Sequence, residues 1–288
     1  MGKVEKAIVI LNYNTWQLTI EFIEALYRLN TIEEYEIVVV DNASPNDSYL
    51  FLKEQKDIGK LKITLLNASA NRGYAAGNNV GLKYSYNKGY KYAFVMNTDL
   101  LFEDLGFLEK MLKVFEKGKD IAVISPRVLM VNGRETNRNL YRPTIWDATF
   151  GKLISKKKKY EISNELVIDT ESCFNYRPQG CCMLVDLSKM NEINYMDEET
   201  FLYGEESILA ERFLKKGYRS VLCLNASIIH NHSQTIKSMS DSKRILKWMN
   251  DSSRIYWIKY RKKSIFSWYI CVMFNYLIFK VKNIKITK

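Results

Sequence analysis

The sequence lacks the cysteine pattern of a disulfide-stabilised or zinc-binding domain. Its 288 residues include five cysteines, an odd number with neither a CxxC pair nor zinc-ribbon spacing. We therefore expect free thiols in a reducing compartment. The five are Cys173, Cys181, Cys182, Cys223 and Cys271.

Two common nucleotide-binding signatures are also missing. No GxxxxGK[ST] motif occurs, and the expected first strand runs into Asn12-Tyr-Asn-Thr-Trp16 where a dinucleotide-binding fold would have GxGxxG. Phosphate hydrolysis by a P-loop and hydride transfer from NAD both lose support. The N-terminus has no signal-peptide layout, so we expect the body of the protein in the cytoplasm.

The net positive charge of the chain is concentrated in its C-terminal part. The net charge is +11, but residues 241–288 hold 12 Lys and Arg against 2 Asp and Glu, a net of +10. The other 240 residues hold 31 against 30, a net of +1. A neutral body with a basic tail argues against a nucleic-acid-binding protein. We predict a catalytic domain over 1–240 and a separate tail over 241–288.

The tail mixes its basic residues with aromatic ones such as Trp248, Trp257 and Trp268, a composition suited to a lipid headgroup interface. Residues 265–279 are almost wholly apolar, about 15 residues where a spanning helix needs roughly 20. An interfacial helix that associates with the membrane is the first interpretation. A short or oligomeric span and a core-packing helix are the alternatives.

Strand and helix patterns alternate over the first 125 residues. After Pro126 the pattern breaks into a polar, basic stretch with a lysine run at 156–159, which we interpret as a solvated loop. The alternation of strands and helices over the first 125 residues predicts an α/β fold with a mostly parallel sheet covered by helices. We expect strands at 6–11, 36–40, 61–66, 92–96, 121–124, 180–186, 220–224 and 226–229, and helices at 16–29, 74–87, 105–115 and 205–216.

Two of these strands end on a carboxylate. The apolar run from Tyr92 stops at Asn97-Thr-Asp99, and the run from Glu36 stops at Asp41. Ligands bind at the carboxyl ends of strands in open α/β sheets. Asp99 is therefore a candidate to hold a metal ion and, through it, a phosphate. Either aspartate alone could simply start a turn, but two on one sheet favour a site.

A glycine-bearing turn, Asn71-Arg-Gly-Tyr-Ala-Ala-Gly-Asn-Asn79, enters the helix expected at 74–87. Backbone N–H groups at a helix N-terminus suit an anionic group, and Arg72 could add a forked donor. The alternative is a loop whose glycines allow tight packing.

The two histidines of the chain, His230 and His232, follow the last expected strand. Imidazole suits first-row divalent metals, so His230 is a plausible second ligand beside Asp99, although a histidine there is often structural. Glu205 and Glu206 begin the helix expected at 205–216. They either offset the helix dipole or supply a general base.

In this order the segments resemble inverting glycosyltransferases of family 2, which have the GT-A fold, and especially the branch of bacterial rhamnosyltransferases. The resemblance covers about residues 7–235. The segments that carry it are Ile8-Val-Ile-Leu-Asn-Tyr-Asn14, Val38-Val-Val-Asp-Asn-Ala-Ser44, Asn71 to Gly81, Met96-Asn-Thr-Asp99, Gly180-Cys-Cys-Met-Leu-Val185, Tyr203-Gly-Glu-Glu206 and His230.

The resemblance implies roles for these residues. The metal-binding motif falls on Asn97-Thr-Asp99, so Asp99 would hold Mg²⁺ or Mn²⁺ against the donor diphosphate. Asp41 would touch the base or ribose. The second member of the Glu205-Glu206 pair would be the base, here Glu206 in place of the usual Asp. The other residues expected to bind the nucleotide sugar are Asn12, Tyr13, Asn14, Arg72, Asn79 and Asn97.

The predicted function is therefore metal-dependent glycosyl transfer with inversion, from a dTDP- or UDP-sugar to a polyprenyl-linked saccharide. Rhamnose is the first choice of sugar, and surface polysaccharide synthesis (capsule or cell wall) at the cytoplasmic face of the membrane is the expected setting. One alternative is a nucleotidyltransferase that forms sugar nucleotides, but the loop after the first strand lacks the glycine-rich, basic sequence typical of that class. Another is a non-catalytic protein that binds membrane or nucleic acid, which would leave Asp41, Asp99, Glu206 and His230 unexplained.

Overall fold

The computed structural model describes residues 5–149, 160–231 and 242–284, with side chains described up to residue 277. The lysine run at 156–159 and His232 lie outside these ranges, so the loop predicted for that run has no structural test.

One mixed sheet organises the chain, with strand order β3-β2-β1-β4-β9-β6-β10-β8-β7 and β5 paired with β10. Strands β3, β2, β1 and β4 form parallel pairs, as do β6 and β10, whereas β9 lies antiparallel between β4 and β6. The predicted α/β fold with a mostly parallel sheet is confirmed. The strands are β1 (Lys6–Asn12), β2 (Tyr35–Asp41), β3 (Thr64–Asn67), β4 (Tyr92–Met96), β5 (Leu100–Leu101), β6 (Ile121–Met130), β7 (Val167–Asp169), β8 (Ser172–Asn175), β9 (Cys182–Asp186) and β10 (Arg219–His230).

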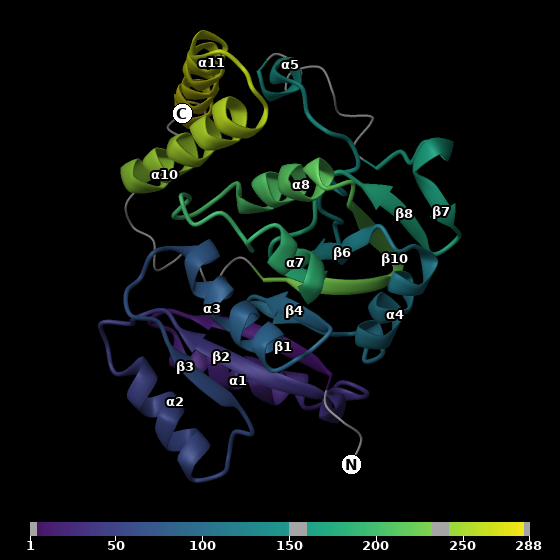
Figure 1. The fold of residues 1–288 in the computed structure, drawn as a ribbon. Coiled ribbons are helices and arrows are strands. Elements are labelled where there is room, and N and C mark those ends of the chain that lie inside the picture. Colours follow the sequence, from purple (N-terminus) through teal and green to yellow (C-terminus); the bar gives the residue numbers. More distant parts are fainter. Residues whose placement is uncertain (1–4, 150–159, 232–241, 285–288) are drawn as a thin grey trace.

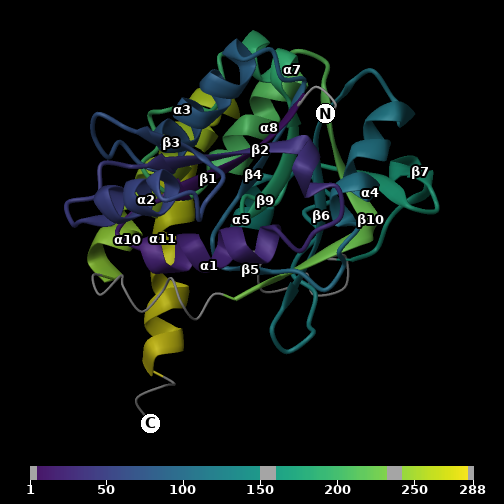
Figure 2. The same ribbon diagram turned by 90° about the horizontal axis from the view of Figure 1, so that it is seen from below.

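Helices cover both faces of this sheet (Figures 1 and 2). One face packs against α3, α7 and α8 and the other against α1, α2 and α4. Short 3-10 turns, among them Ile32–Glu34, Val114–Lys117 and Asn164–Leu166, link some of the elements. The helices of the body are α1 (Trp16–Leu26), α2 (Ser48–Asp57), α3 (Tyr74–Asn87), α4 (Phe107–Lys113), α5 (Ile145–Ala148), α7 (Leu187–Glu192) and α8 (Glu205–Lys215).

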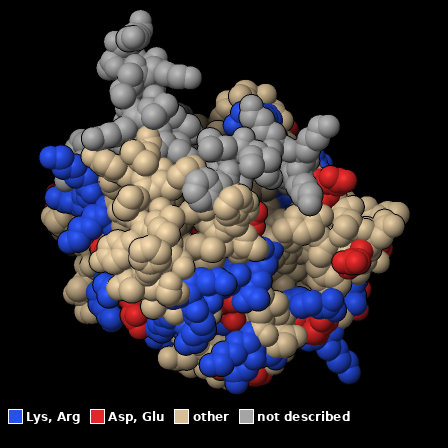
Figure 3. Space-filling model, turned by 90° about the horizontal axis from the view of Figure 1, so that it is seen from above, with Lys and Arg blue, Asp and Glu red and all other residues tan. Residues whose placement is uncertain are grey.

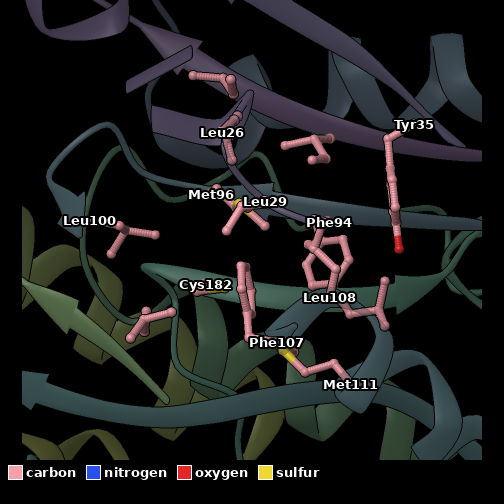
Figure 4. Packing of buried hydrophobic residues seen from close by; sticks show 14 of the residues in the cluster. Leu26, Leu29, Tyr35, Phe94, Met96, Leu100, Phe107, Leu108, Met111 and Cys182 are labelled. Carbon is pink, nitrogen blue, oxygen red and sulfur yellow. The ribbon is translucent and has the colours of Figure 1, made fainter. Parts of the chain in front are cut away.

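Alternation along each strand divides the core into two layers. Ile8 and Ile10 of β1 belong to the cluster beneath α1 and α4, while Val9 between them belongs to the cluster beneath α3 and α8. Figure 4 shows the first layer, where Phe94 lies against Phe107 with ring centroids 5.9 Å apart. All five cysteines are buried free thiols, as predicted.

Several element boundaries differ from those predicted. Strand β6 passes through Pro126 and continues to Met130, although the sequence pattern predicted a break at the proline. The two strands predicted at 220–224 and 226–229 form one strand, β10, with an irregularity in its register between Cys223 and Ser227. Helix α2 was not predicted, because only Ser48 and Leu52 are buried along its length and its apolar pattern is weak.

The tail forms three helical elements, α10 (Ser242–Arg254), a π-helical turn (Ile255–Tyr260) and α11 (Ile265–Ile284). Tyr256 and Trp257 of the π-helical turn pack on Ile208 of α8, so this part of the tail contacts the body directly. No helix in the described part of the chain has the length and hydropathy needed to cross a bilayer. The boundary near residue 240 stays a prediction, since it falls within 232–241.

Candidate functional site

The carboxyl ends of β1 and β2 form a buried polar cluster. Asn12 donates from Nδ2 to Asp41 Oδ2 over 2.7 Å and accepts a hydrogen bond from the Thr19 hydroxyl over 2.8 Å. Asp41 also accepts from the backbone N–H and the hydroxyl of Ser44, at 2.9 and 2.8 Å. The parallel pairing of β1 with β2 places Asn12 directly opposite Asp41. These two predicted residues therefore meet at one strand edge.

Tyr13 and Asn14 continue this edge toward solvent. Tyr13 is 43% exposed, and the backbone of Asn14 has a positive φ of 62°. The Asn14 N–H donates to Ser44 Oγ over 2.9 Å, and its carbonyl accepts from Asn46 over 3.3 Å. The segment after β1 and the loop after β2 thus form a common polar rim that could contact a nucleotide.

Asp99, three residues past the end of β4, meets His230, the last residue of β10. The His230 Nε2 atom lies 3.1 Å from Asp99 Oδ2, and both side chains are nearly buried. The Asp99 carbonyl accepts from the Asn231 N–H over 2.9 Å. Asn97, just before, donates its backbone N–H to the Cys181 carbonyl over 2.9 Å. The two residues proposed as metal ligands from sequence are therefore in contact.

This pair fits a divalent cation that is shared with a substrate. Carboxylate and imidazole are both ligands for Mn²⁺, and Mg²⁺ is commonly held by one or two carboxylates together with substrate phosphates. Among the described residues no cluster of three or more His, Cys, Asp or Glu could hold a metal ion. Asp99 and His230 would thus hold the cation together with oxygen atoms from the donor or from water.

Glu205 and Glu206 begin α8 after Gly204, whose positive φ of 81° suits glycine. Glu205 is 6% exposed, and its Oε1 has no hydrogen-bond partner among the described residues. Burial, and then the charge of Glu206, raise the pKa of Glu205 to about 8. The Glu206 side chain is 23% exposed and its Oε2 lies 3.6 Å from Arg177 Nη1. Of these two acids, Glu206 is therefore the one with an accessible carboxylate.

Cys181 belongs to the segment between Asp99 and Glu206. Burial raises the pKa of its thiol, and the charges of Asp99 and Glu206 raise it further. The contacts agree with this, since Asn97 donates to the Cys181 carbonyl over 2.9 Å and a Cβ atom on the preceding Gly180 would lie 2.2 Å from Glu206 Oε1. Tyr74 closes the same region, since its hydroxyl donates to the Gly180 carbonyl over 2.7 Å. Burial raises the pKa of Tyr74 as well, with contributions from Glu206 and Glu205.

Arg72 and Asn79 meet at a different carboxylate. Arg72 is largely exposed and lies 3.1 Å from Glu198 Oε2, and buried Asn79 donates to Glu198 Oε1 over 3.0 Å. Asn79 also exchanges hydrogen bonds with the backbone of Met196, at 2.9 and 3.0 Å. Both residues therefore hold the segment before α8. Their contact with a nucleotide sugar stays a prediction.

The N-terminus of α3 is already engaged by protein groups. The Tyr74 N–H donates to the Phe201 carbonyl over 2.9 Å, and the Gly73 N–H donates to Asn71 Oδ1 over 3.0 Å. A Cβ atom on Gly73 would lie 2.1 Å from the Phe201 carbonyl oxygen. The tight-packing alternative thus explains this glycine, whereas the anion site suggested by the motif would have to use other N–H groups.

Comparison with known proteins identifies the family and the fold. The model of the family described as Glycosyl transferase family 2 matches residues 7–179, more than half of the chain. This chain belongs to glycosyl transferase family 2. A relative, the low-salt glycan biosynthesis hexosyltransferase Agl10 of Haloferax volcanii, is 26% identical over 227 residues, which cover 78% of this chain and 66% of the relative. The chain thus spans just under two thirds of that relative's length.

Two solved structures share the fold of this family 2 protein. The mannosyltransferase PcManGT from Pyrobaculum calidifontis, in complex with GDP-Man and Mn²⁺, superimposes with a TM-score of 0.58 at 13% identity, covering 90% of this chain and 65% of that one. S. aureus TarS 1-349 in complex with UDP-GlcNAc gives 0.56 at 14% identity, covering 94% and 71%. The predicted GT-A fold is confirmed, while the rhamnosyltransferase branch stays a prediction.

Several residues of the site had no role predicted from the sequence. Gly180 and Cys181 belong to the motif at 180–185, but the sequence does not show that they lie between Asp99 and Glu206. That position depends on the antiparallel pairing of β9 with β4, which brings the start of β9 beside the end of β4. Arg177 precedes that strand in an irregular segment. No local signal distinguished it from the other arginines of the basic stretch.

Proposed function

We propose that this family 2 protein transfers a sugar from a nucleoside-diphosphate donor to a hydroxyl group, with inversion at the anomeric carbon. The observation that carries the proposal is that both carboxylates flank residues 180–181: Glu206 Oε1 lies 2.2 Å from where a Cβ atom on Gly180 would be, and Asn97, two residues before Asp99, donates to the Cys181 carbonyl over 2.9 Å. One carboxylate ends a strand, where a donor diphosphate would lie. The other begins a helix and is accessible to an acceptor.

Glu206 would act as the general base. The acceptor oxygen attacks the anomeric carbon from the face opposite the nucleoside diphosphate, the bond to the diphosphate breaks, and Glu206 takes the proton of the attacking hydroxyl. Glu205 does not suit this role, because its pKa of about 8 keeps it protonated near neutral pH. Arg177 holds the Glu206 carboxylate from one side.

Donor binding would use the neighbouring strand ends. Asn12 and Asp41 form a fixed polar pair for the base or ribose, with Tyr13 and Asn14 at the rim. Asp99 and His230 would hold Mg²⁺ or Mn²⁺. When bound, such a cation offsets the charge that grows on a departing diphosphate.

The finer parts of the proposal concern sugar, acceptor and location. Rhamnose from a dTDP- or UDP-sugar is the first choice, and other hexoses fit the same site, in keeping with the hexosyltransferase name of the relative Agl10. The acceptor would be a polyprenyl-linked saccharide of a surface polysaccharide, met at the cytoplasmic face of the membrane. The net charge of +10 over residues 241–288 supports a membrane-held acceptor.

The test is a transfer assay with a set of nucleotide sugars and a polyprenyl-linked acceptor, with products identified by mass. We expect one donor to give a product heavier by one sugar and to release its nucleoside diphosphate. Thermal shift with UDP, dTDP, RNA and NAD, each with Mn²⁺, is the companion measurement. Stabilisation by RNA or NAD without stabilisation by UDP or dTDP would reject the proposal.

A further inference from the structure

Helix α11 exposes a continuous apolar face. Phe266, Ile270, Met273 and Leu277 are 71%, 40%, 64% and 56% exposed, and their spacing of four, three and four residues places them on one side of a helix. Tyr269, 53% exposed, lies beside them. Scattered exposed apolar residues are normal on a soluble protein, but a contiguous row marks an interaction surface.

The opposite face of α11 is fixed to the protein. Trp268 is buried there in a cluster that includes Ile145 and Ala148 of α5, and buried Cys271 donates from Sγ to the Ala148 carbonyl over 3.6 Å. Val272 packs against the same cluster. A helix that holds protein on one side and presents apolar side chains on the other can lie in the plane of an interface, with its apolar face toward the lipid.

Positive charge surrounds this face. Lys262 and Lys263 are exposed immediately before α11, and Lys243, Arg244 and Lys247 are exposed on α10. Figure 3 shows a mostly uncharged surface at this end of the molecule with Lys and Arg side chains along its margin. Two copies of the chain meeting through this face would bring like charges together. An anionic surface would instead attract them.

We propose that α11 lies flat on an anionic lipid bilayer and inserts the face formed by Phe266, Tyr269, Ile270, Met273 and Leu277. Lys262 and Lys263 contact the lipid headgroups. The inference deepens the proposed function and rests on it for one point, that the acceptor is met at this surface. Figure 2 shows α11 extending past the rest of the molecule, where a flat surface can reach it.

The position of the proposed site relative to this surface is set by the rest of the tail. Trp248 of α10 stacks on Phe201 with centroids 4.6 Å apart, and Ser252 donates to the Leu202 carbonyl over 3.1 Å. Lys259 lies 2.9 Å from Asp197 Oδ2. All three partners belong to the loop that leads into Glu205 and Glu206. The part of the tail that precedes α11 is therefore joined to the segment before the proposed base by direct contacts.

The experiment is flotation of the full chain with phosphatidylcholine vesicles, with and without phosphatidylglycerol. We expect binding to the anionic vesicles, weakened by salt. The double variant Phe266→Ser, Met273→Ser should bind at least about tenfold more weakly, because each side chain loses its transfer from water into lipid. Lys262→Glu with Lys263→Glu should remove the preference for anionic lipid.

The matched control is Leu50→Ser with Ile58→Ser, which removes two exposed apolar side chains, Leu50 on α2 at 62% and Ile58 just after its end at 67%. It should bind vesicles like the wild type. Equal binding by the α11 variant would overturn the inference. So would the absence of vesicle binding together with a dimer in solution that the α11 variant dissociates, because the face would then belong to a second copy. Transfer to a water-soluble acceptor analogue, measured separately, tests the proposed function without the membrane.

Discussion

The carboxylate of Glu206 lies in the space that a Cβ atom on Gly180 would fill. Such a Cβ would be 2.2 Å from Glu206 Oε1 and 2.8 Å from its Cδ. The next residue, Cys181, accepts a hydrogen bond from Asn97 at the start of the proposed metal-binding motif. The segment at 180–181 therefore separates the proposed base from the proposed metal site, and its small size lets the base approach.

Gly180→Ala should reduce turnover while the protein stays folded. The atoms that the new methyl group meets belong to the end of a flexible side chain, so Glu206 would turn away rather than the backbone moving. We expect kcat to fall by about tenfold or more, as the base leaves hydrogen-bond reach of the acceptor. The KM for the donor should change little, and steady-state kinetics with a melting curve measures both effects.

Gly106→Ala is the matched control. A Cβ atom there meets only Asp104 Oδ1 at 3.7 Å, an ordinary contact, and the φ of Gly106 is −97°. Its kinetics should equal those of the wild type. A Gly180→Ala enzyme with unchanged kcat would show that Glu206 is not positioned through this contact.

Exchange of the two neighbouring acids for amides should separate their roles. Glu206→Gln removes the proposed base and should lower turnover by about 10² to 10⁴ with donor binding nearly intact. Glu205→Gln replaces a buried, protonated acid with a group of the same shape and should keep most of the activity. Single-turnover rates and donor titration measure the two quantities. The reverse pattern would assign the base to Glu205, and a normal rate for Glu206→Gln would remove it from the mechanism.

Stability should depend on pH through Glu205. Burial and Glu206 raise its pKa from 4.5 to about 8 in the folded protein, so between these values the folded state keeps a proton that the unfolded state releases. The free energy of unfolding should therefore fall as pH rises from about 4.5 to about 8. Glu205→Gln should gain stability relative to the wild type across this window, as measured by chemical denaturation at several pH values.

Glu206→Gln offers a second check on this pH dependence. Because the charge of Glu206 is the second cause of the raised pKa of Glu205, its removal should make the loss of stability smaller and end it at a lower pH. Parallel pH profiles for the wild type and Glu205→Gln would mean that Glu205 is ionised in the folded protein at neutral pH.

The strand ends were predictable from sequence because a buried parallel strand has a local signature. The runs that end at Asp41 and Asp99 are apolar, short and followed by turn residues, and the structure places β2 and β4 on either side of β1. Asn12 opposite Asp41 follows from that pairing. The contact between His230 and Asp99 needed only that β10 end at the same edge.

The arrangement around Glu206 was less predictable, because it depends on contacts between segments far apart in the chain. Tyr74 and Gly180 are 106 residues apart and joined by one hydrogen bond. The ion pair of Arg177 with Glu206 likewise depends on the path of an irregular segment. For Arg72 and Asn79 the sequence motif predicted contact with a nucleotide sugar. In the structure both side chains contact Glu198.

The tail shows why composition alone left three alternatives for residues 265–279. Charge and aromatic content suggested an interface, but they do not say which side of a helix faces the protein. The packing of Trp268 against α5 and the hydrogen bond from Cys271 Sγ to the Ala148 carbonyl give that direction. The core-packing alternative thus describes one face of α11, and the interfacial prediction concerns the other.

Removal of the metal ligands should weaken donor binding in a way that depends on the cation. Asp99→Asn keeps the shape of the side chain and removes its charge, and His230→Ala removes the imidazole that lies 3.1 Å from it. We expect the thermal stabilisation by UDP with Mn²⁺ to fall sharply in both variants, whereas stabilisation by UDP in EDTA should equal that of the wild type. Turnover should require added Mn²⁺ or Mg²⁺.

Asp104→Asn provides the control for these metal variants, because Asp104 is a carboxylate engaged by Lys110 on the surface at 2.8 Å. Its response to UDP with Mn²⁺ should match the wild type. Full activity of the wild-type enzyme in EDTA would withdraw the metal roles of both Asp99 and His230. It would leave Glu206 as base untouched, because proton transfer from the acceptor hydroxyl does not depend on the cation. The charge on the departing diphosphate would then have to be offset by protein groups, and Arg72, largely exposed beside Glu198, is the first candidate to test.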